Sequence, residues 1–560
     1  KNNMRYEIPP VPGWSHMKTY KAVIVGAGIA GLAAAKTLLD TGVRDFVILE
    51  AQDHAGGRIN SVTLNGGWVE AGAQWIHGQN NEVWRLAHKY NLLSDITSSE
   101  GEGPYLREDG VEFQPSLVKE VQSVVERILE ECEQYADENC MKTFPKSIGH
   151  HLKSKFEEYL NSCQDSQERR RMKEELYDWH TKFQVIDNSC SSLNKLSAKA
   201  WGTYLFSGGK DYVNFNGGYS SLVKNIVNEL PANALHLNCP VNIVKWEEKL
   251  QVKENYKADS IIQTTNKERL LTNGYKLDAL LEKIGHEDRR HSWDSPPVMV
   301  LCDNGTFYAA DHIIVTCSLG CLKQKYKTMF DPQLPDSMIQ AIEDMGFATI
   351  NKIFLSYKKP WWDTGTKGFQ LLWSKYNLCI PSREEKCSWT RDLTGFDVVY
   401  GQEAVLVGWV GGKGAELVEE LTEEEVGEHC TTLLRQFTRN KNIPLPTRVI
   451  RSEWHKNKYV QGGYSHSTEK CDVSSAGPSD LIQPVYSQVY YNNIPSERKH
   501  PVVMLAGEAA HEHYFSTTHG AYETGQKQGR VILDYLKSQS MLPVVKKQPS
   551  LEYSLQQVQL

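Results

Sequence analysis

The sequence lacks a hydrophobic run long enough to cross a membrane. A transmembrane helix needs about 18 or more consecutive apolar residues, and none of the 560 residues belongs to such a run. No secretory signal peptide is visible, and the final Val-Gln-Leu is not a peroxisomal signal. We therefore expect a cytoplasmic protein with no membrane partner. The chain begins with Lys1, which leaves open whether an N-terminal targeting segment was removed.

The cysteines lack a metal-binding spacing. The 12 cysteines are scattered singly, no Cys-x-x-Cys pair occurs, and Cys317 and Cys321 flank a predicted turn. Structural zinc sites use closely spaced pairs of cysteine or histidine ligands. We expect reduced, buried thiols and no metal ion.

Positive charge is not in excess. The chain has 62 Lys and Arg against 69 Asp and Glu, a net charge of -7, and no basic stripe that would indicate nucleic acid as a partner. The length exceeds what one simple core accommodates, so two domains are expected. The 14 Trp and 26 Tyr suit large apolar cavities. No feature decides the oligomeric state, and a monomer is favoured.

The most informative stretch begins with an apolar strand, Ala22–Val25, followed by glycines in the pattern G-x-G-x-x-G. Gly26 allows the tight turn, Gly28 lets a pyrophosphate approach the backbone, and Gly31 lets the helix pack on the strand. The Ala- and Leu-rich segment 32–39 predicts a helix whose positive N-terminal end faces the phosphates. Such a glycine pattern alone also occurs in ordinary strand-to-helix turns.

The residues after these glycines make an ordinary turn a poor explanation. A second apolar strand, Phe46–Leu49, ends at Glu50, which lies about 20 residues after the last glycine, where a carboxylate binds a ribose diol. Gly56, Gly57 and Arg58 come next. This double glycine with an arginine is typical of flavin enzymes, so we predict FAD as the cofactor.

Near the other end of the chain, a strand-like VVMLAG run leads to Gly507 and Glu508, and a predicted helix begins at Thr518 and runs to about Leu536. Gly520 and Ala521 near the N-terminus of this helix form a second binding site for an anionic group such as the flavin ring. The alternative for Thr517 and Thr518 is simple capping of the helix.

Lys352 is a single cation in a predicted extended segment, 346–357, where it shares a face with Ile350, Phe354 and Ser356. An unpaired buried ammonium is costly, so a lowered pKa or a water contact is expected. The alternative is an edge position from which the side chain reaches solvent.

In the segment 72–78, GAQWIHG, Trp75 and His77 share a face if the chain is extended; an ordinary structural histidine is the alternative for His77.

Other segments predict the remaining architecture. Helical spacing covers 115–180, a strand runs from Pro240-Val241 to Trp246, and 247–295 is a polar surface insertion. We also expect a hairpin with arms 298–302 and 306–309, a separate strand 311–316, a strand 405–410 and one amphipathic helix over 416–437.

Six separated motifs carry a resemblance to a known family: VIVGAGIAGL with VILEA and GGR, then GAQWIHG, CSLGCLK, NKIFLSYKKPWW, GGYS and LAGEAAHEHYFSTTHGAYETG. In this order they resemble the flavin-dependent amine oxidases, most of all the branch with spermine oxidase and N1-acetylpolyamine oxidase. The likeness covers roughly residues 20–540.

This resemblance implies roles for particular residues. Lys352 matches the lysine that holds a water against the reactive flavin nitrogen, and His77 matches a histidine that lines the amine site. Trp75, Tyr464, Asp187 and Thr517 are the implied substrate contacts. The implied cofactor contacts are Gly26, Gly28, Ala30, Gly31, Glu50, Ala51, Gly57, Arg58, Gly72, Ala73, Gln74, Trp75, Val241, Trp454, Gly507, Glu508, Thr517, Thr518 and Ala521.

The sequence departs from the family pattern at three places. Gly463 stands where monoamine oxidases have their flavin-linking cysteine, and their membrane helix is missing, so FAD should be non-covalent. Thr517 replaces the second aromatic wall opposite Tyr464, so the cavity should be more open there. Lys195 stands where spermine oxidases have an acid, with Asp187 as the nearest carboxylate; a cation there should repel a distal ammonium.

The expected fold is α/β, with a discontinuous Rossmann-type FAD-binding domain and an α+β substrate-binding domain. The FAD-binding segments are 19–94, 212–325 and 458–540; the substrate segments are 95–211, which is mainly helical, and 326–457. Residues 1–18 form an arm and 541–560 a tail. We predict an enzyme that oxidises a polyamine with dioxygen, giving hydrogen peroxide. The alternatives are an oxidase of monoamines or amino acids and a non-catalytic FAD-binding protein.

Overall fold

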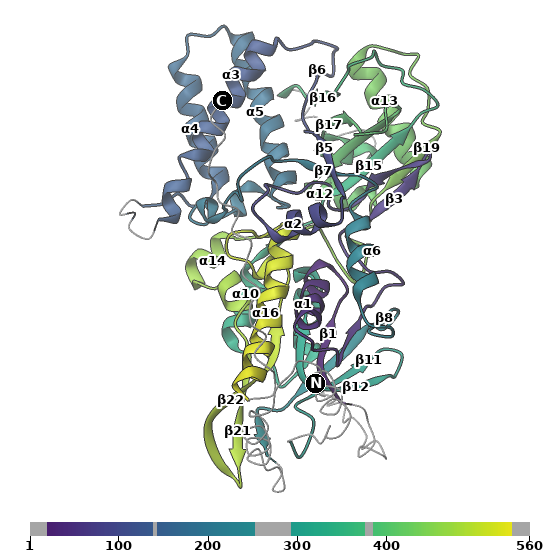
Figure 1. Cartoon of the computed structure of the whole chain (residues 1–560). Coiled ribbons are helices and arrows are strands. Elements are labelled where there is room, and N and C mark those ends of the chain that lie inside the picture. The colour runs from purple at the N-terminus through teal and green to yellow at the C-terminus, as the bar shows by residue number, and fades with distance from the viewer. Residues whose placement is uncertain (1–18, 138–139, 141–142, 253–292, 376–384, 540–560) are drawn as a thin grey trace, which may run out of the picture.

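A computed structural model describes residues 19–137, 140, 143–252, 293–375 and 385–539. The predicted arm 1–18, most of the insertion and the tail 541–560 lie outside these residues. Two large sheets organise the described chain (Figure 1). No helix of the described part is long and apolar enough to span a membrane.

The first sheet has ten strands in the order β10-β21-β22-β12-β1-β2-β8, extended by β11 on β12, β9 on β11 and β13 on β9. Strands β22, β12, β1, β2 and β8 run parallel, as the dinucleotide-binding pattern requires. Its strands are β1 (Thr19–Val25), β2 (Phe46–Leu49), β8 (Leu235–His236), β9 (Val241–Trp246), β10 (Lys249–Gln251), β11 (Val298–Cys302), β12 (Phe307–Val315), β13 (Phe330–Asp331), β21 (Val485–Tyr491) and β22 (Ile494–Leu505).

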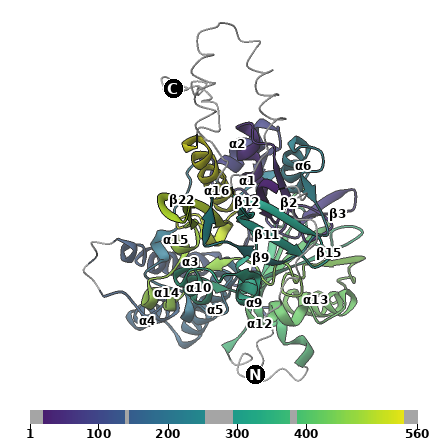
Figure 2. The same cartoon turned by 90° about the horizontal axis from the view of Figure 1, so that it is seen from below.

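Helices cover both faces of this sheet, which is the layering that a parallel sheet needs to bury its two faces. Ala22 and Ile24 of β1 pack in one core with α1 (Ile29–Asp40), α6 (Ser220–Glu229) and α16 (Thr518–Ser538). Val23 and Val25 point the other way, into a core with α9 (Leu319–Met329) and α10 (Asp336–Asp344). Seen from below, α1 and α16 lie on one side of β12 and α9 on the other (Figure 2).

The second sheet has six strands in the order β19-β15-β18-β17-β16-β6. One face packs against α13 (Glu423–Thr438), and the other is covered in part by the hairpin β3 (Ser61–Leu64) and β4 (Gly67–Glu70). Its strands are β6 (Tyr105–Arg107), β15 (Asn351–Ser356), β16 (Gly368–Leu372), β17 (Leu393–Val398), β18 (Val405–Val410) and β19 (Arg448–Arg451).

The remaining elements lie beside these sheets. Helices α3, α4 and α5 form a separate block with its own core, which confirms the helical prediction for 115–180 (Figure 1). Their bounds, with those of the other elements, are α2 (Glu82–Lys89), α3 (Pro115–Glu130), α4 (Ile148–Ser162), α5 (Gln167–Asp187), α12 (Gly412–Val418), α14 (Glu469–Ser474), α15 (Pro478–Leu481), β5 (Leu93–Thr97) with β7 (Val213–Phe215), and β14 (Gly346–Phe347) with β20 (Ser465–His466).

Three predictions of local structure are wrong in detail. The single helix over 416–437 is two helices, because the hydroxyl of Thr422 accepts from the Glu425 N–H and starts α13 afresh. The separate strands 306–309 and 311–316 are one strand, β12. The insertion 247–295 includes β10, which pairs with β21 in the large sheet. The domain boundaries stay a proposal.

Candidate functional site

A cavity of about 610 Å³ lies where the two sheets approach each other, a size within the usual range of ligand sites. Val25 and Leu49, at the carboxyl ends of β1 and β2, line the cavity. Lys352 and Trp409 of the second sheet also line it. Ligands in open α/β sheets bind beyond the carboxyl ends of the strands, so this is the expected place for a dinucleotide.

The surroundings of the three glycines of the first loop suit the roles predicted for them. Gly26 has φ of 100°, in the left-handed region that favours glycine. A Cβ on Gly28 would meet no atom within 4 Å, and Gly28 lines the cavity. A Cβ on Gly31 would lie 2.0 Å from the Gly26 carbonyl oxygen. Gly28 therefore leaves room for a ligand, whereas Gly31 serves packing and does not line the cavity.

Helices α1 and α16 present their N-termini to the same cavity. Gly28 precedes α1 without any side-chain cap, so the first N–H groups of that helix keep their capacity for a phosphate. The two helices pack closely, because Gly525 of α16 lies against the backbone of Ala30, where a Cβ would come 2.0 Å from the carbonyl oxygen. One cavity thus holds two positive helix ends.

Thr517 and Thr518 both line the cavity at the start of α16. Thr517 is the N-cap residue: its Oγ1 accepts from the Gly520 N–H at 3.0 Å, which confirms the capping alternative for this residue. Thr518 shares a hydrogen bond with the Tyr219 hydroxyl. Both threonines have a structural role at the start of α16. A contact with a ligand would be additional to that role.

Glu50 directly follows β2 and faces the glycine loop. Its carboxylate accepts from the Ala27 N–H at 2.7 Å and from the Gln52 N–H at 2.8 Å. These bonds fix the loop that carries Gly28 and orient the carboxylate, which keeps lone pairs for a ribose hydroxyl. Ala51 and Val241 line the same end of the cavity.

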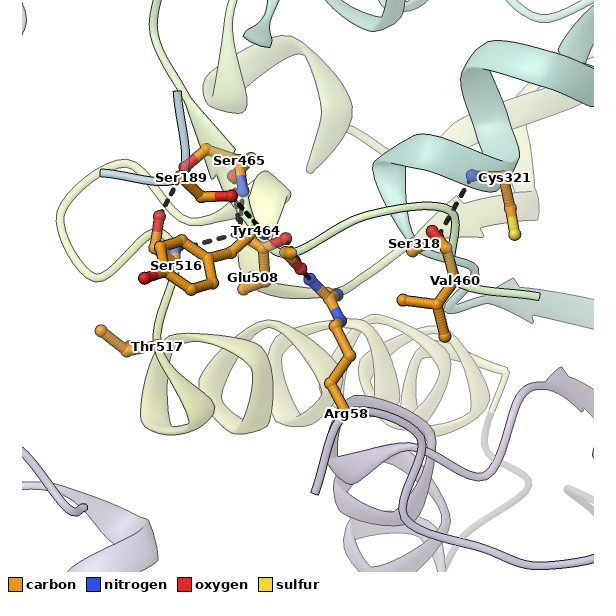
Figure 3. A network of polar contacts seen from close by, with 12 residues as sticks. Arg58, Ser189, Ser318, Cys321, Val460, Tyr464, Ser465, Glu508, Ser516 and Thr517 are labelled. Carbon is orange, nitrogen blue, oxygen red and sulfur yellow. Dashed lines mark hydrogen bonds and ion pairs between the residues drawn. The ribbon is translucent and has the colours of Figure 1, made fainter. Parts of the chain in front are cut away.

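Arg58 and Glu508 both line the cavity and form an ion pair at 2.8 Å. Glu508 also accepts from Ser465 Oγ at 2.5 Å and from the Ser516 N–H at 3.0 Å, and Arg58 donates to the Gly463 carbonyl (Figure 3). One carboxylate therefore connects the loop after β2, the segment with Tyr464 and the start of α16.

Lys352 on β15 is buried, with 3% of its surface exposed. Its Nζ donates to the carbonyl oxygens of Glu70 and Gly72 at 2.9 and 2.8 Å and to Gln74 Oε1 at 3.0 Å. The prediction of a cation among apolar neighbours was therefore wrong about its contacts. Burial lowers the pKa of Lys352 to about 7, while the carboxylates of Glu70 and Glu100 oppose that shift.

Aromatic rings form the wall around this lysine. Trp75 stacks on Trp409 with ring centroids 6.1 Å apart and meets Tyr212 edge-on at 5.2 Å. Tyr212 also meets the His77 ring, at 5.6 Å, so Trp75 and His77 share a face as predicted. Tyr464 lies on the wall near α5 and donates through its hydroxyl to the Ile186 carbonyl at 3.0 Å. Trp454 joins the wall by donating to Ala71.

The cavity also has acidic side chains in its lining, of which the sequence prediction named Asp187, Glu50 and Glu508. Glu100 and Asp211 line it as well. Asp211 accepts from His77 Nδ1 at 2.9 Å, so the neutral ring leaves Nε2 as an acceptor. Burial raises the pKa of Glu100 to about 8, with the neighbouring carboxylates of Asp187 and Asp397 adding to the shift. Burial also raises the pKa of Asp187.

The cavity brings together every predicted site residue except Gly31. Lys195 is not among the lining residues; it is exposed, and its Nζ lies 3.4 Å from Ser191 Oγ. The next two residues, Leu196 and Ser197, do line the cavity, and Lys195 acts electrostatically on the lining residue His466. The repulsion of a distal ammonium therefore stays a prediction. Glu100, Asp211 and Trp409 are among the lining residues that the sequence prediction missed. They belong to no motif, and nothing in their local sequence marks them as cavity residues. The described residues contain no cluster suited to a metal ion.

Comparison with known proteins agrees with this geometry. A family model described as flavin containing amine oxidoreductase matches residues 29–271 and 267–533. The chain is 30% identical to the peroxisomal N(1)-acetyl-spermine/spermidine oxidase of Bos taurus, over 93% of this chain and 96% of that protein. It is 29% identical to the protein of that name from Homo sapiens, with the same coverage.

A solved structure of wild-type putrescine oxidase bound to putrescine has a similar fold. Its TM-score is 0.63 at 16% sequence identity, covering 92% of this chain and 100% of the other. At this identity the likeness concerns the fold.

Proposed function

Because the chain belongs to the family of flavin-containing amine oxidoreductases, we propose that it oxidises a polyamine, spermine or an N1-acetylated polyamine, with dioxygen. It is a flavin-dependent enzyme whose cofactor is FAD, held non-covalently. The residues present suit this group: Gly28 leaves the space that a pyrophosphate needs, Arg58 supplies a cation, and two helix N-termini point into one cavity.

The observation that carries the proposal is the continuity of the cavity. It extends from the glycine loop at Gly28 to Lys352, Trp75 and Tyr464, so a dinucleotide and an amine would lie end to end in one cavity. FAD bound by Gly28, Arg58 and the two helix N-termini would supply the hydride acceptor for the carbon next to the amine nitrogen, and dioxygen would be the final electron acceptor, with hydrogen peroxide as its product. The amine becomes an imine, which water hydrolyses.

The protein's part in this chemistry is positioning, desolvation and proton transfer. Only the neutral amine has the lone pair that assists hydride loss, so the substrate ammonium must first lose a proton. His77 Nε2, oriented by the bond from Nδ1 to Asp211, is the acceptor that we propose for that proton. The rings of Trp75, Trp409 and Tyr464 exclude water and so favour the neutral amine.

Lys352 is the second catalytic residue that we propose. An ammonium close to the reacting centre stabilises negative charge that develops on dioxygen. The water-holding role implied by the family resemblance is a further part of this proposal. It requires that one N–H of Lys352 turns from its present acceptors, Glu70, Gly72 and Gln74, to a water.

The test is anaerobic mixing of the yellow holoenzyme with spermine, N1-acetylspermine, benzylamine and a set of amino acids. Loss of absorbance of the bound flavin with spermine or N1-acetylspermine supports the proposal, and the faster of the two identifies the substrate. Bleaching by benzylamine or an amino acid alone would replace it with the monoamine or amino-acid alternative. No bleaching by any amine would favour a non-catalytic FAD-binding protein. Cytoplasmic location and a monomeric state stay predictions.

A further inference from the structure

Glu100 lines the cavity from a turn that is held by hydrogen bonds with three other residues. The N–H of the next residue, Gly101, donates to Asp397 of β17 at 3.1 Å, and its carbonyl accepts from the Tyr105 hydroxyl at 3.1 Å. Gln370 of β16 donates to the Glu102 carbonyl at 2.9 Å. Strands β16 and β17 of the second sheet therefore hold the backbone just after Glu100.

The Glu100 carboxylate has no hydrogen-bond donor among the residues that the structure describes, and neither has that of Asp187; both line the cavity. By contrast, Asp211 in the same cavity accepts from His77 at 2.9 Å and from the Tyr212 N–H at 2.9 Å. Lys352 is near enough to interact with Glu100 electrostatically, but its N–H groups go to other acceptors. Glu100 is half-buried and Asp187 is exposed within the empty cavity, so a cation that enters the cavity has access to both carboxylates and stabilises their charged form.

Aromatic rings lie near these two acids. Both Glu100 and Asp187 act electrostatically on the hydroxyls of Tyr212 and Tyr464. Aromatic faces accept methylene groups and cationic nitrogens. Carboxylates beside aromatic walls match a flexible chain of methylenes that carries more than one ammonium.

We propose that Glu100 binds a cationic nitrogen of the substrate other than the nitrogen that is oxidised, and so selects amines with at least two positive charges. This inference rests on the proposed function and names a specificity-determining residue for it. Asp187 supplies a second carboxylate in the same cavity, and the reacting nitrogen lies near Lys352 and His77.

The experiment compares Glu100→Gln with wild-type holoenzyme for spermine and for butylamine, which carries one charge. Steady-state kcat and KM are measured for spermine; for butylamine the same values are measured, or its inhibition constant if it is not turned over. Loss of one charge-assisted hydrogen bond should raise KM for spermine about 10- to 100-fold, with kcat changed less than about twofold. The constants for butylamine should stay unchanged.

Two further variants control this comparison. Glu112→Gln removes the same charge from an exposed side chain outside the cavity and should leave all constants unchanged. Glu100→Asp keeps the charge and should recover part of the affinity for spermine. FAD absorbance and melting temperature are recorded for each variant, so that a folding defect is recognised.

The outcomes separate this inference from the proposed function. If wild-type enzyme oxidises spermine but Glu100→Gln does so with unchanged KM, the inference is wrong and the function stands. An equal loss of affinity for spermine and butylamine would also overturn it, because Glu100 would then act on the cavity as a whole. If no amine bleaches the wild-type flavin, the proposed function fails first.

Discussion

The Lys352 ammonium lies over the indole ring of Trp409, with Nζ 4.1 Å from the ring centroid. The two residues face each other directly in the ladder between β15 and β18, so the pairing of two strands creates the contact. Trp409 in turn stacks on Trp75. Since burial lowers the pKa of Lys352 to about 7, both of its protonation states are accessible near neutral pH.

Replacing Lys352 by methionine should leave FAD bound and slow turnover strongly. The variant removes an ammonium from the end of the cavity where we propose that the amine reacts, while the glycine loop, Arg58 and Glu508 stay in place. We expect a decrease of about 100-fold or more in the rate of flavin reoxidation by dioxygen, measured by rapid mixing after anaerobic reduction. Lys358→Met, in an exposed position just after the same strand, is the matched control. Wild-type reoxidation in Lys352→Met would remove this lysine from the mechanism.

The charge of Lys352 also predicts a pH dependence. The ammonium is present below its pKa of about 7 and is lost above it, so a step that needs the positive charge slows as pH rises through this value. Reoxidation of the wild-type flavin should therefore decline around pH 7. Lys352→Met should show no such step, and a wild-type profile that is flat from about pH 6 to 8 would contradict the assignment.

Alanine substitution should have different effects at Gly28 and at Gly31, two glycines of the first loop. Gly28→Ala places a methyl group in empty space in the cavity, so we expect a folded protein with its ordinary circular dichroism that no longer binds FAD. Gly31→Ala brings a methyl group to 2.0 Å from the Gly26 carbonyl, so it should lower the free energy of unfolding by about 1–3 kcal/mol. Thermal unfolding without added FAD separates the two, and a Gly28→Ala variant that keeps the yellow cofactor would refute the first expectation.

Glu508 should control how tightly the cofactor is held. Its carboxylate accepts from Arg58, Ser465 and Ser516, and an amide in its place can satisfy only part of this set. Glu508→Gln should speed FAD dissociation about 10-fold or more, since a buried charge-assisted bond is worth about 1.5–3 kcal/mol. Release of FAD is followed by fluorescence. The exposed Glu512, four residues on, provides the control Glu512→Gln; equal release rates in the two variants would argue against the role of Glu508.

A stacked pair of buried histidines should make the fold sensitive to acid. The ring centroids of His312 and His500 lie 4.5 Å apart. His312 Nδ1 donates to the Pro501 carbonyl, and His500 Nε2 donates to the Asp311 carbonyl. Burial lowers the pKa of His312 to about 3 and also lowers that of His500, although the buried Asp311 beside them favours protonation and Lys21 opposes it.

Because these folded-state pKa values lie below the unfolded value of about 6.5, the unfolded chain binds more protons. The stabilising effect is complete above about pH 6.5 and decreases as pH falls below it, by up to about 1.4 kcal/mol per pH unit for each histidine. The slope of unfolding free energy between about pH 6.5 and 5 should be smaller in His312→Gln than in wild-type protein. His88→Gln, at an exposed position, should keep the wild-type slope, and an unchanged slope in His312→Gln would contradict the linkage.

Local features of this protein were predictable because neighbouring residues determine them. The turn at Gly26, the open backbone at Gly28 and the acid at Glu50 lie within one strand–helix–strand unit, where chain connectivity fixes the geometry. The cap at Thr517 and the alternation that puts Lys352 and Phe354 on one face of β15 also depend on adjacent residues. The long helix over 416–437 failed because the capping box at Thr422 outweighed a continuous apolar pattern.

The sequence alone therefore determined the cofactor-binding unit, the two positive helix ends and the strand that carries Lys352. Only the tertiary structure decided what meets this lysine and which acids enter the cavity. Trp409, Glu70 and Gln74 reach Lys352 from distant segments, and Glu100 is turned inward by contacts with Asp397 and Gln370. Such contacts depend on strand register and on the packing of two sheets, which the order of residues along one segment does not specify.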